Sequence, residues 1–233
     1  GYDSAGIVLD SENADFEVAK TKGKVDDLVA ISKNLAGKSH IAMGHTRWAT
    51  HGVPSDRNSH PHLSNNGKIA LIHNGIIENY DTIKIMLTEK GFTFQSETDT
   101  EVLLNLIQYF MDTTEDIDFP TAVRYALNEV YGAYAITVMH DDFPGELVVA
   151  RLGSPLAIGL GNKEYFIASD ASPFVEFTKE AVYLEEGHMA TISLEKGVDI
   201  RNIKDNEKIT PQIQELKLNL EQIEKGGYEH FML

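Results

Sequence analysis

The apolar positions of residues 1–131 predict an alternation of short strands and helices. Strands are expected where apolar residues form short runs, and helices where they recur every three or four residues. The expected strands are Ala5–Leu9, Phe16–Lys20, Ile41–Met43 and Lys68–His73. The expected helices are Val25–Leu35, Tyr80–Lys90, Val102–Phe110 and Phe119–Val130. Gly37 and Gly91 are expected to end the first two helices, and Pro120 lies in the first turn of the last one.

From Gly132 onward the hydrophobic period changes to two, which is typical of half-buried strands. Short glycine- and proline-containing turns separate the runs. The expected strands are Ala133–His140, Glu146–Leu152, Leu156–Leu160, Tyr165–Ser169, Ala181–Leu184, His188–Leu194 and Val198–Ile203, with a short helix opening at Ser172-Pro173. Two groups of strands and a block of helices favour a layered α+β fold.

The C-terminal end of the chain follows a different pattern. Residues Pro211–Ile223 have the spacing of an amphipathic helix, and Lys225-Gly226-Gly227 interrupts it. We therefore expect a folded domain over residues 1–203, followed by a C-terminal helix and a linker over residues 204–233.

The start of the third expected helix carries a capping signature. Thr98 precedes the apolar run and Glu101 follows three residues later, so Thr98 is expected to cap the helix while Glu101 reaches back to it. Asp99 then lies in the first turn, where a carboxylate adds about 0.3–1 kcal/mol of stability. Its alternative role is recognition of an ammonium group on a ligand.

The long polar segment from His45 to Asn66 is a candidate site, because loops of this length are commonly functional. Arg47 and Trp48 are adjacent in it. A guanidinium binds a carboxylate through two parallel hydrogen bonds, although a structural ion pair for Arg47 and a core position for Trp48 are alternatives. The histidines of the segment lack the spacing of a metal site, so we expect structural histidines and no metal.

His73-Asn74-Gly75 directly follows an expected strand. The Asn-Gly pair predicts a turn. An asparagine side-chain N–H and a glycine main-chain N–H at a strand end are also a suitable pair of donors for an oxyanion, as acyl transfer requires.

Together these features describe one ligand. Arg47 suits a carboxylate, Asp99 suits an ammonium group, and Asn74 with Gly75 suits a carbonyl oxygen that gains negative charge. A free amino acid with an acyl side chain, such as glutamine, carries all three groups. No serine or threonine of the chain stands in an activating sequence context, so the nucleophile is missing.

Composition excludes several classes of function. The chain has 20 Lys and Arg against 36 Asp and Glu, a formal charge of −16, which disfavours nucleic acid and anionic membranes as partners. No apolar stretch is long enough to cross a membrane. The absence of cysteine excludes disulfides, thiolate metal sites and a cysteine nucleophile within this chain. We expect a soluble, cytoplasmic protein.

Five stretches, in order, resemble the glutaminase domain of the glutamine–fructose-6-phosphate aminotransferase family, which belongs to the class II N-terminal-nucleophile amidotransferases. They are Gly1–Gly6, Gly44–Gly52, His60–His62, His73–Asn79 and Ser96–Glu101. The terminal segment Gly227–Leu233 is similar to the linker that leads into the second half of these proteins. The string from Thr46 to Gly52 is specific to the family, whereas His-Asn-Gly is shared more widely in the class.

The resemblance implies an αββα four-layer sandwich with two antiparallel sheets, here with the first strand missing. It implies that Arg47 binds the α-carboxylate of glutamine, that Asp99 binds its α-ammonium group, and that Asn74 and Gly75 form the oxyanion hole. Further residues implied to line the pocket are Trp48, which would close the ammonia passage, Thr50 and His51.

The same resemblance implies hydrolysis of glutamine to glutamate, with ammonia supplied to a sugar-phosphate isomerase half that converts fructose 6-phosphate to glucosamine 6-phosphate. It implies no metal and no organic cofactor, and homo-oligomers formed through the other half. The family's nucleophile is an N-terminal cysteine ahead of the first motif, with its own α-amine as base. We therefore expect a fragment that is inactive as written.

The sequence is also compatible with three other functions. One is another class II amidotransferase, which the string around Arg47 and the C-terminal segment disfavour. A second is a non-catalytic amino-acid-binding module, which needs Arg47 and Asp99 but no cysteine. The third is a purely structural interaction domain.

Overall fold

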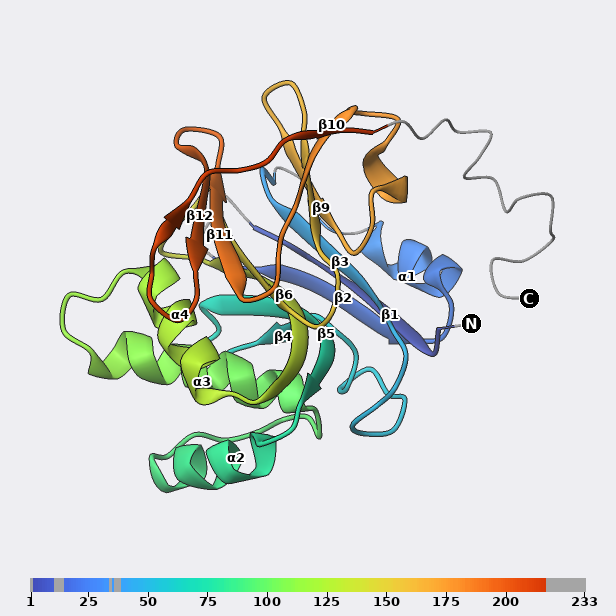
Figure 1. Cartoon of the computed structure of the whole chain (residues 1–233). Coiled ribbons are helices and arrows are strands. Elements are labelled where there is room, and N and C mark those ends of the chain that lie inside the picture. The colour runs from blue at the N-terminus through green and yellow to red at the C-terminus, as the bar shows by residue number, and fades with distance from the viewer. Residues whose placement is uncertain (1, 11–14, 34, 36–38, 217–233) are drawn as a thin grey trace.

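A computed structural model describes residues 2–10, 15–33, 35 and 39–216 of the chain (Figure 1). Its helices are α1 (Val25–Ser32), α2 (Tyr80–Glu89), α3 (Asp99–Thr113), α4 (Phe119–Glu129) and the short 3₁₀ helix η1 (Ser172–Phe174). Its strands are β1 (Ser4–Leu9), β2 (Glu17–Lys22), β3 (Ala42–Arg47), β4 (His62–Leu63), β5 (Ile69–Ile77), β6 (Gly132–His140), β7 (Glu146–Leu152), β8 (Ala157–Leu160), β9 (Tyr165–Ala168), β10 (Glu180–Tyr183), β11 (His188–Ser193), β12 (Gly197–Asn202), β13 (Lys208–Ile209) and β14 (Gln214–Glu215).

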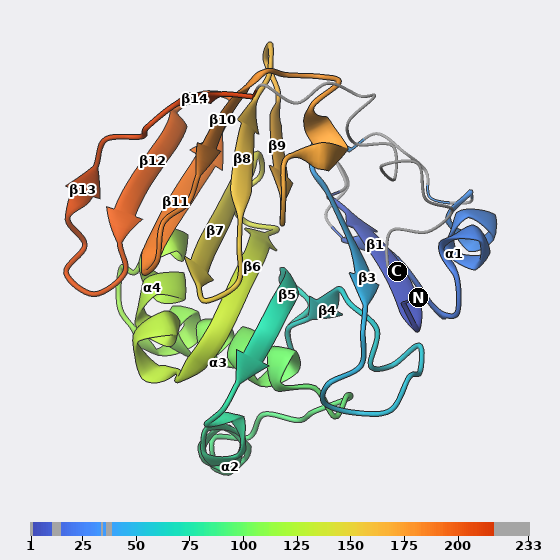
Figure 2. The same ribbon diagram turned by 45° about the vertical axis from the view of Figure 1, so that its right-hand side comes forward.

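The largest layer is a seven-stranded antiparallel sheet with the strand order β13-β12-β11-β7-β6-β5-β4. Figure 2 shows it running from β13 on the left to β4 near the centre. Because side chains alternate along a strand, β5 contributes to two cores. Ile69 and Leu71 pack among the residues of the helices, whereas Ala70 and Ile72 pack against β1 and β3.

Helices α2, α3 and α4 cover one face of this sheet (Figure 1). The first ten residues of α3, Asp99–Gln108, are all buried, because α3 lies against α2, α4 and β5. An apolar core containing Leu103, Ile107 and Ile136 joins the helix to the sheet. Burial of this kind holds the N-terminus of α3 in a fixed position at the end of β5.

Two smaller sheets cover the opposite face, with the orders β2-β1-β3 and β14-β10-β8-β9. Met43 of β3 packs on Met139, and Ile158 of β8 packs in a second core with Val149. Helix α1 lies against β1 and β2 on the outer side. The predicted α+β four-layer sandwich is thus confirmed, but its second sheet layer is divided into two hydrogen-bonded sheets rather than one.

The division leaves a groove between β3 and β9, which are edge strands within the described residues. The groove has a volume of about 510 Å³. Gly44 of β3 and Ile167 of β9 lie on its two sides, and Ile72 of β5 forms part of its floor.

The turn predicted at Asn74-Gly75 is wrong, since β5 continues through both residues to Ile77. Gly75 pairs with Tyr134 of β6 and has a φ of 135°, a conformation that side chains disfavour. A Cβ on Gly75 would lie 2.0 Å from the Ala133 carbonyl oxygen. The glycine is therefore required by close approach of two strands and not by a turn.

The amphipathic helix predicted over Pro211–Ile223 is also wrong over residues 211–216. The chain there forms β14, which pairs with β10, after β13 has paired with β12. Hydrogen bonding of β14 to β10 outweighs the helical spacing of the sequence. The remainder of that prediction, together with the break at 225–227 and the helix end at Gly37, lies outside the described residues.

The capping prediction at α3 is half confirmed. Thr98 Oγ1 accepts a hydrogen bond of 3.3 Å from the Glu101 N–H. The Glu101 carboxylate does not return to Thr98; its oxygens accept from the main-chain N–H groups of Gln95 and Ser96, at 2.7 and 2.6 Å. This buried glutamate thereby fixes the loop before α3 to the helix.

Replacement of Gly6 in β1 by alanine should destabilise the protein, because the new Cβ would lie 2.0 Å from the main-chain oxygen of His60. Overpacking against backbone typically costs about 1–3 kcal/mol. Urea unfolding at pH 7.5 measures the change in the free energy of unfolding. Gly44→Ala on neighbouring β3 is the matched control, since its Cβ would meet only the Gly6 oxygen at 3.9 Å. Equal stabilities of the two variants would contradict the close approach.

Candidate active site

A cavity of about 340 Å³ lies where β3, the end of β5 and the N-terminus of α3 meet. Six of the seven site residues singled out from the sequence line it: Arg47, Trp48, Thr50, Asn74, Gly75 and Asp99. The seventh, His51, does not line the cavity. Its ring packs edge-on against Tyr80, with centroids 5.0 Å apart, and its Nδ1 lies 4.0 Å from Asp99 Oδ1.

Arg47 ends β3 and is only 4% exposed. Its Nη2 donates to the main-chain oxygens of His51 and Gly52, the latter at 3.1 Å, and so folds the following loop around the guanidinium. Its Nη1 is buried and has no hydrogen-bond partner among the described residues. Burial lowers the pKa of Arg47, while Asp3 and Asp99 oppose that shift. A positive charge with a free donor at the cavity wall suits an anionic ligand group.

Asp99 is the first residue of α3 and is 3% exposed. Its Oδ2 accepts a 2.7 Å hydrogen bond from the main-chain N–H of Ile77, the last residue of β5. No described group donates a hydrogen bond to Oδ1, and His51 Nδ1 lies 4.0 Å from it. Oδ2 therefore stabilises the fold, whereas Oδ1 is available to a cation in the cavity.

A pair of glycines shapes the end of β5. Gly132 of β6 has a φ of 130°, and a Cβ there would lie 2.1 Å from the Ile76 oxygen. A Cβ on Gly75 would likewise meet the main-chain oxygen of Ala133, so the two strands approach more closely here than a side chain permits. The regular alternation of β5 ends at this point, so both Asn74 and the following Gly75 border the cavity.

Four histidines lie around the floor of the cavity. His60 Nε2 and His73 Nδ1 both contact Thr100 Oγ1, at 2.9 and 3.0 Å, and the rings of His45 and His60 lie 4.5 Å apart. Because a hydroxyl has one proton, Thr100 donates to one ring and accepts from the other. Burial is the largest cause that lowers the pKa of His45, His60, His62 and His73, so all four are neutral at pH 7.

A second polar network holds the loop between β3 and β4 against the segment before α3. The fully buried Asn58 donates from Nδ2 to the Val53 oxygen and to Glu97 Oε2, each at 2.9 Å. Its Oδ1 accepts from the Glu97 N–H at 3.0 Å. The loop that carries Trp48 is thus fixed at both ends, while Trp48 itself is 62% exposed at the cavity mouth.

Sequence reasoning did not identify Asn58, Thr100 or the contact of His60 and His73 with Thr100. Their partners lie 27 to 40 residues away in the chain, so no local pattern signals them. In the sequence, Gly132 marked only the change of hydrophobic period before the expected strand at Ala133, although its position opposite the end of β5 fixes the shape of the site.

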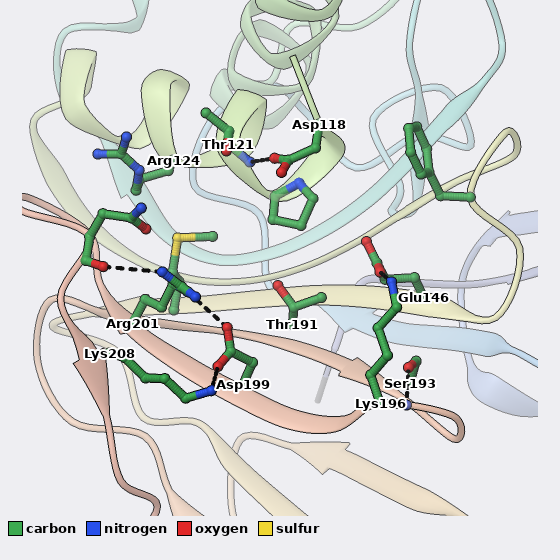
Figure 3. Close-up of a pocket in the computed structure, with 14 residues that line it drawn as sticks. Asp118, Thr121, Arg124, Glu146, Thr191, Ser193, Lys196, Asp199, Arg201 and Lys208 are labelled. Atoms are coloured by element: carbon green, nitrogen blue, oxygen red, sulfur yellow. Dashed lines mark hydrogen bonds and ion pairs between the residues drawn. The ribbon is translucent and has the colours of Figure 1, made fainter. Parts of the chain in front are cut away.

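A larger cavity of about 540 Å³ lies beside α4, over β11, β12 and β13 (Figure 3). Its charged groups are largely paired with one another. Figure 3 shows Arg201 and Lys208 both directed at Asp199, at 2.8 and 2.7 Å. Lys196 lies 3.6 Å from Glu146. Since these charges neutralise each other, the cavity offers less recognition chemistry than the one at Arg47.

Within residues 2–10, 15–33, 35 and 39–216, no three His, Asp or Glu side chains are placed to hold a metal ion. In the same part of the chain, no helix is both long and apolar enough to span a membrane.

Comparison with known proteins relates this site to one family. Residues 32–226 match the family described as "Glutamine amidotransferase domain". Glutamine–fructose-6-phosphate aminotransferase (isomerizing) of Bacteroides thetaiotaomicron is 51% identical over 235 residues, covering 100% of this chain and 38% of that protein. The protein of the same name from Pyrococcus horikoshii is 44% identical over 233 residues, with the same coverages. The chain therefore spans well under half the length of these relatives.

Solved structures give the same relationship. Glutamine phosphoribosylpyrophosphate amidotransferase from B. subtilis, complexed with ADP and GMP, superposes with a TM-score of 0.72 at 29% identity, covering 88% of this chain and 44% of that one. A structure described as the allosteric regulatory enzyme of purine biosynthesis gives 0.74 at 30% identity, with the same coverages.

The neutral histidines predict that the protein loses stability as the pH falls from 7.5 to 5.5. The unfolded chain binds protons at its histidines near pH 6.5, whereas the buried rings resist protonation. The unfolded state then holds more protons, and each such histidine costs up to about 1.4 kcal/mol per pH unit below 6.5. The free energy of unfolding in urea at several pH values measures the slope. His62→Gln, which keeps a partner for Thr98, should make it shallower. A flat profile over this range would contradict neutral buried histidines.

Proposed function

We propose, from the premise that the chain belongs to the glutamine amidotransferase family, that its cavity binds glutamine and forms most of a glutaminase active site. The observation that carries the proposal is the presence of two unfilled, oppositely charged groups in one cavity. Arg47 Nη1 has no partner among the described residues, and Asp99 Oδ1 accepts no hydrogen bond there. An amino acid supplies a carboxylate for the first and an ammonium group for the second.

The reacting end of the substrate is assigned to the end of β5. Asn74 Oδ1 is occupied by His45 Nε2 at 2.9 Å, which leaves the Nδ2 donor of Asn74 for a ligand. In this assignment Asn74 Nδ2 and the Gly75 N–H stabilise the oxygen of the side-chain amide as it becomes an oxyanion. Thr50 and Trp48 border the same space, and His51 Nδ1 lies 4.0 Å from Asp99 Oδ1.

The nucleophile in this proposal is the thiol of an N-terminal cysteine on a segment that precedes residue 1. The groove between β3 and β9 supports this placement, because both are edge strands within the described part of the chain and the groove adjoins His45 and Asn74. A strand seated there would join the two small sheets. It would also bring its first residue towards the cavity.

In the proposed reaction the cysteine α-amine takes the thiol proton, and the thiolate attacks the side-chain amide carbon of glutamine. The resulting oxyanion is stabilised by Asn74 and Gly75. The C–N bond breaks, and the nitrogen accepts the proton from the α-ammonium group and leaves as ammonia. Water then cleaves the thioester, which yields glutamate and restores the thiol.

The activity of the whole protein is proposed from its relatives. These relatives are named glutamine–fructose-6-phosphate aminotransferases, and the chain covers 38% of their length. We assign the ammonia to a sugar-phosphate isomerase half, reached past the exposed Trp48, that converts fructose 6-phosphate to glucosamine 6-phosphate. A cytoplasmic location and oligomers formed through that half belong to the same proposal. So does a linker over the part of residues 204–233 that follows β14, since β13 and β14 belong to the sheets of the domain.

A second candidate is a non-catalytic amino-acid-binding module. The absence of cysteine from residues 1–233 favours it, since Arg47 and Asp99 are sufficient for binding. The two candidates differ in whether the full-length protein releases ammonia from glutamine.

Arg47→Ala should weaken glutamate binding by about 2 kcal/mol or more, roughly 30-fold, because the charge-assisted contact to the carboxylate is lost. Calorimetry on the full-length protein measures the affinity, and an ammonia assay measures glutamine hydrolysis. Arg124→Ala is the matched control, since this arginine lies at the cavity beside α4.

Three outcomes distinguish the glutaminase from the amino-acid-binding module. Loss of affinity together with hydrolysis by the unaltered full-length protein supports the glutaminase, and residues 1–233 alone should then bind glutamate without hydrolysing glutamine. Binding without hydrolysis in the full-length protein would favour the binding module. Unchanged affinity in Arg47→Ala would remove Arg47 from the ligand site.

A further inference from the structure

A side-chain amide can stabilise an oxyanion only if its nitrogen, and not its oxygen, faces the reacting group. We propose that His45 is a positioning residue that holds Asn74 in this orientation, through a hydrogen bond from the imidazole Nε2 to Asn74 Oδ1. The inference rests on the proposed function and adds to it a residue that acts through Asn74.

The geometry begins with the two strands that carry these residues. Asn74 lies on the face of β5 that also presents Ala70 and Ile72 to β1 and β3. His45 is in β3, opposite Gly6 of β1, and its Nε2 lies 2.9 Å from Asn74 Oδ1. Because the amide group is planar, an oxygen held by His45 directs the nitrogen away from β3.

The alternative orientation has a clear cost. If the Asn74 amide turned by 180°, its oxygen would take the place of the nitrogen that borders the cavity. Two partly negative oxygens, that of Asn74 and that of the substrate amide, would then face each other as charge develops. An unanchored asparagine interconverts between the two orientations, so the fixed orientation is what makes the donor effective.

The surroundings of His45 decide which ring nitrogen carries the proton. The imidazole ring packs against His60, with centroids 4.5 Å apart, and lies near Arg47 and His73. Burial among these groups disfavours a second positive charge, so the ring carries a single proton. Its Nδ1 is buried and has no partner of hydrogen-bond geometry in the described part of the chain, although the main chain of His73 lies beside the ring. Asn74 Oδ1 can only accept, so the proton lies on Nε2.

This arrangement predicts an effect on kcat rather than on KM. Ground-state affinity comes from Arg47 and Asp99, which do not depend on the Asn74 amide. Removal of an oxyanion donor outright lowers kcat by about 10²–10³-fold. Loss of its orientation should cost less, about 10- to 100-fold in kcat, with KM for glutamine changed by less than about 2-fold.

The test uses the full-length protein and a double-mutant cycle. His45→Phe keeps a flat ring against His60 but has no N–H, and His45→Gln restores an N–H donor for Asn74. Each is combined with Asn74→Ala, and kcat and KM for glutamine hydrolysis are measured for all variants. Glutamate affinity by calorimetry reports whether each variant retains a folded site, and His45→Leu replaces His45→Phe if that protein does not fold.

We expect His45→Phe to lower kcat alone, His45→Gln to recover most of the loss, and His45→Phe to cost less than about 2-fold when Asn74 is already alanine. The proposal is overturned if His45→Phe costs as much in the Asn74→Ala background as alone, if it raises KM instead, or if His45→Gln is no better. An unaltered protein that hydrolyses no glutamine overturns the proposed function and this assignment with it. An active protein lacking the coupling overturns only the assignment.

Discussion

The carboxylate of Asp99 is the interaction on which the site depends. Through Oδ2 it holds the last N–H of β5 at 2.7 Å, and through its position in the first turn of α3 it joins the helical layer to the sheet. The same side chain presents Oδ1 to the cavity. Because one buried group carries both tasks, the end of β5 and the charge that faces the ligand cannot move independently.

The second constraint on the site is the group of buried polar side chains beneath this carboxylate, here called the polar floor, which includes Thr100, His60 and His73. Buried polar groups are costly unless they are hydrogen-bonded, and here Thr100 supplies one hydrogen-bond partner to each of two histidine rings. Glu101 fixes the loop before α3 in the same manner. The apolar core around α3 supplies the rigidity, while the polar floor determines which atoms face the cavity. We therefore interpret the neutral histidines as parts of the scaffold of the site.

Much of the fold follows from local patterns. The cap at Thr98, the apolar spacing of α3 and the period of two after Gly132 each act within a few residues, and the structure contains the elements they predict. Arg47, Asn74 and Asp99 were assigned to one ligand from their chemistry, and they border one cavity. Local signals of this kind are strong where neighbouring residues alone decide the conformation.

The wrong predictions share one physical cause. Each concerns residues that form hydrogen bonds with strands far away in the sequence. Asn74-Gly75 has the composition of a turn, yet pairing with β6 keeps it in a strand. Residues 211–216 have helical spacing, yet hydrogen bonds to β10 draw part of that segment into a sheet. The tight contact of Gly6 with His60 and the division of the second sheet layer likewise depend on partners that no sequence window contains.

In the proposed binding mode, Arg47, Asp99 and Asn74 together hold a single amino acid in one direction. A crystal structure of the full-length protein with bound glutamate would reveal that direction. We expect the α-carboxylate on Arg47 Nη1, the α-ammonium group on Asp99 Oδ1 and the side-chain carboxylate beside Asn74 Nδ2. Glutamate bound with its ends reversed, or bound only in the cavity beside α4, would contradict this binding mode.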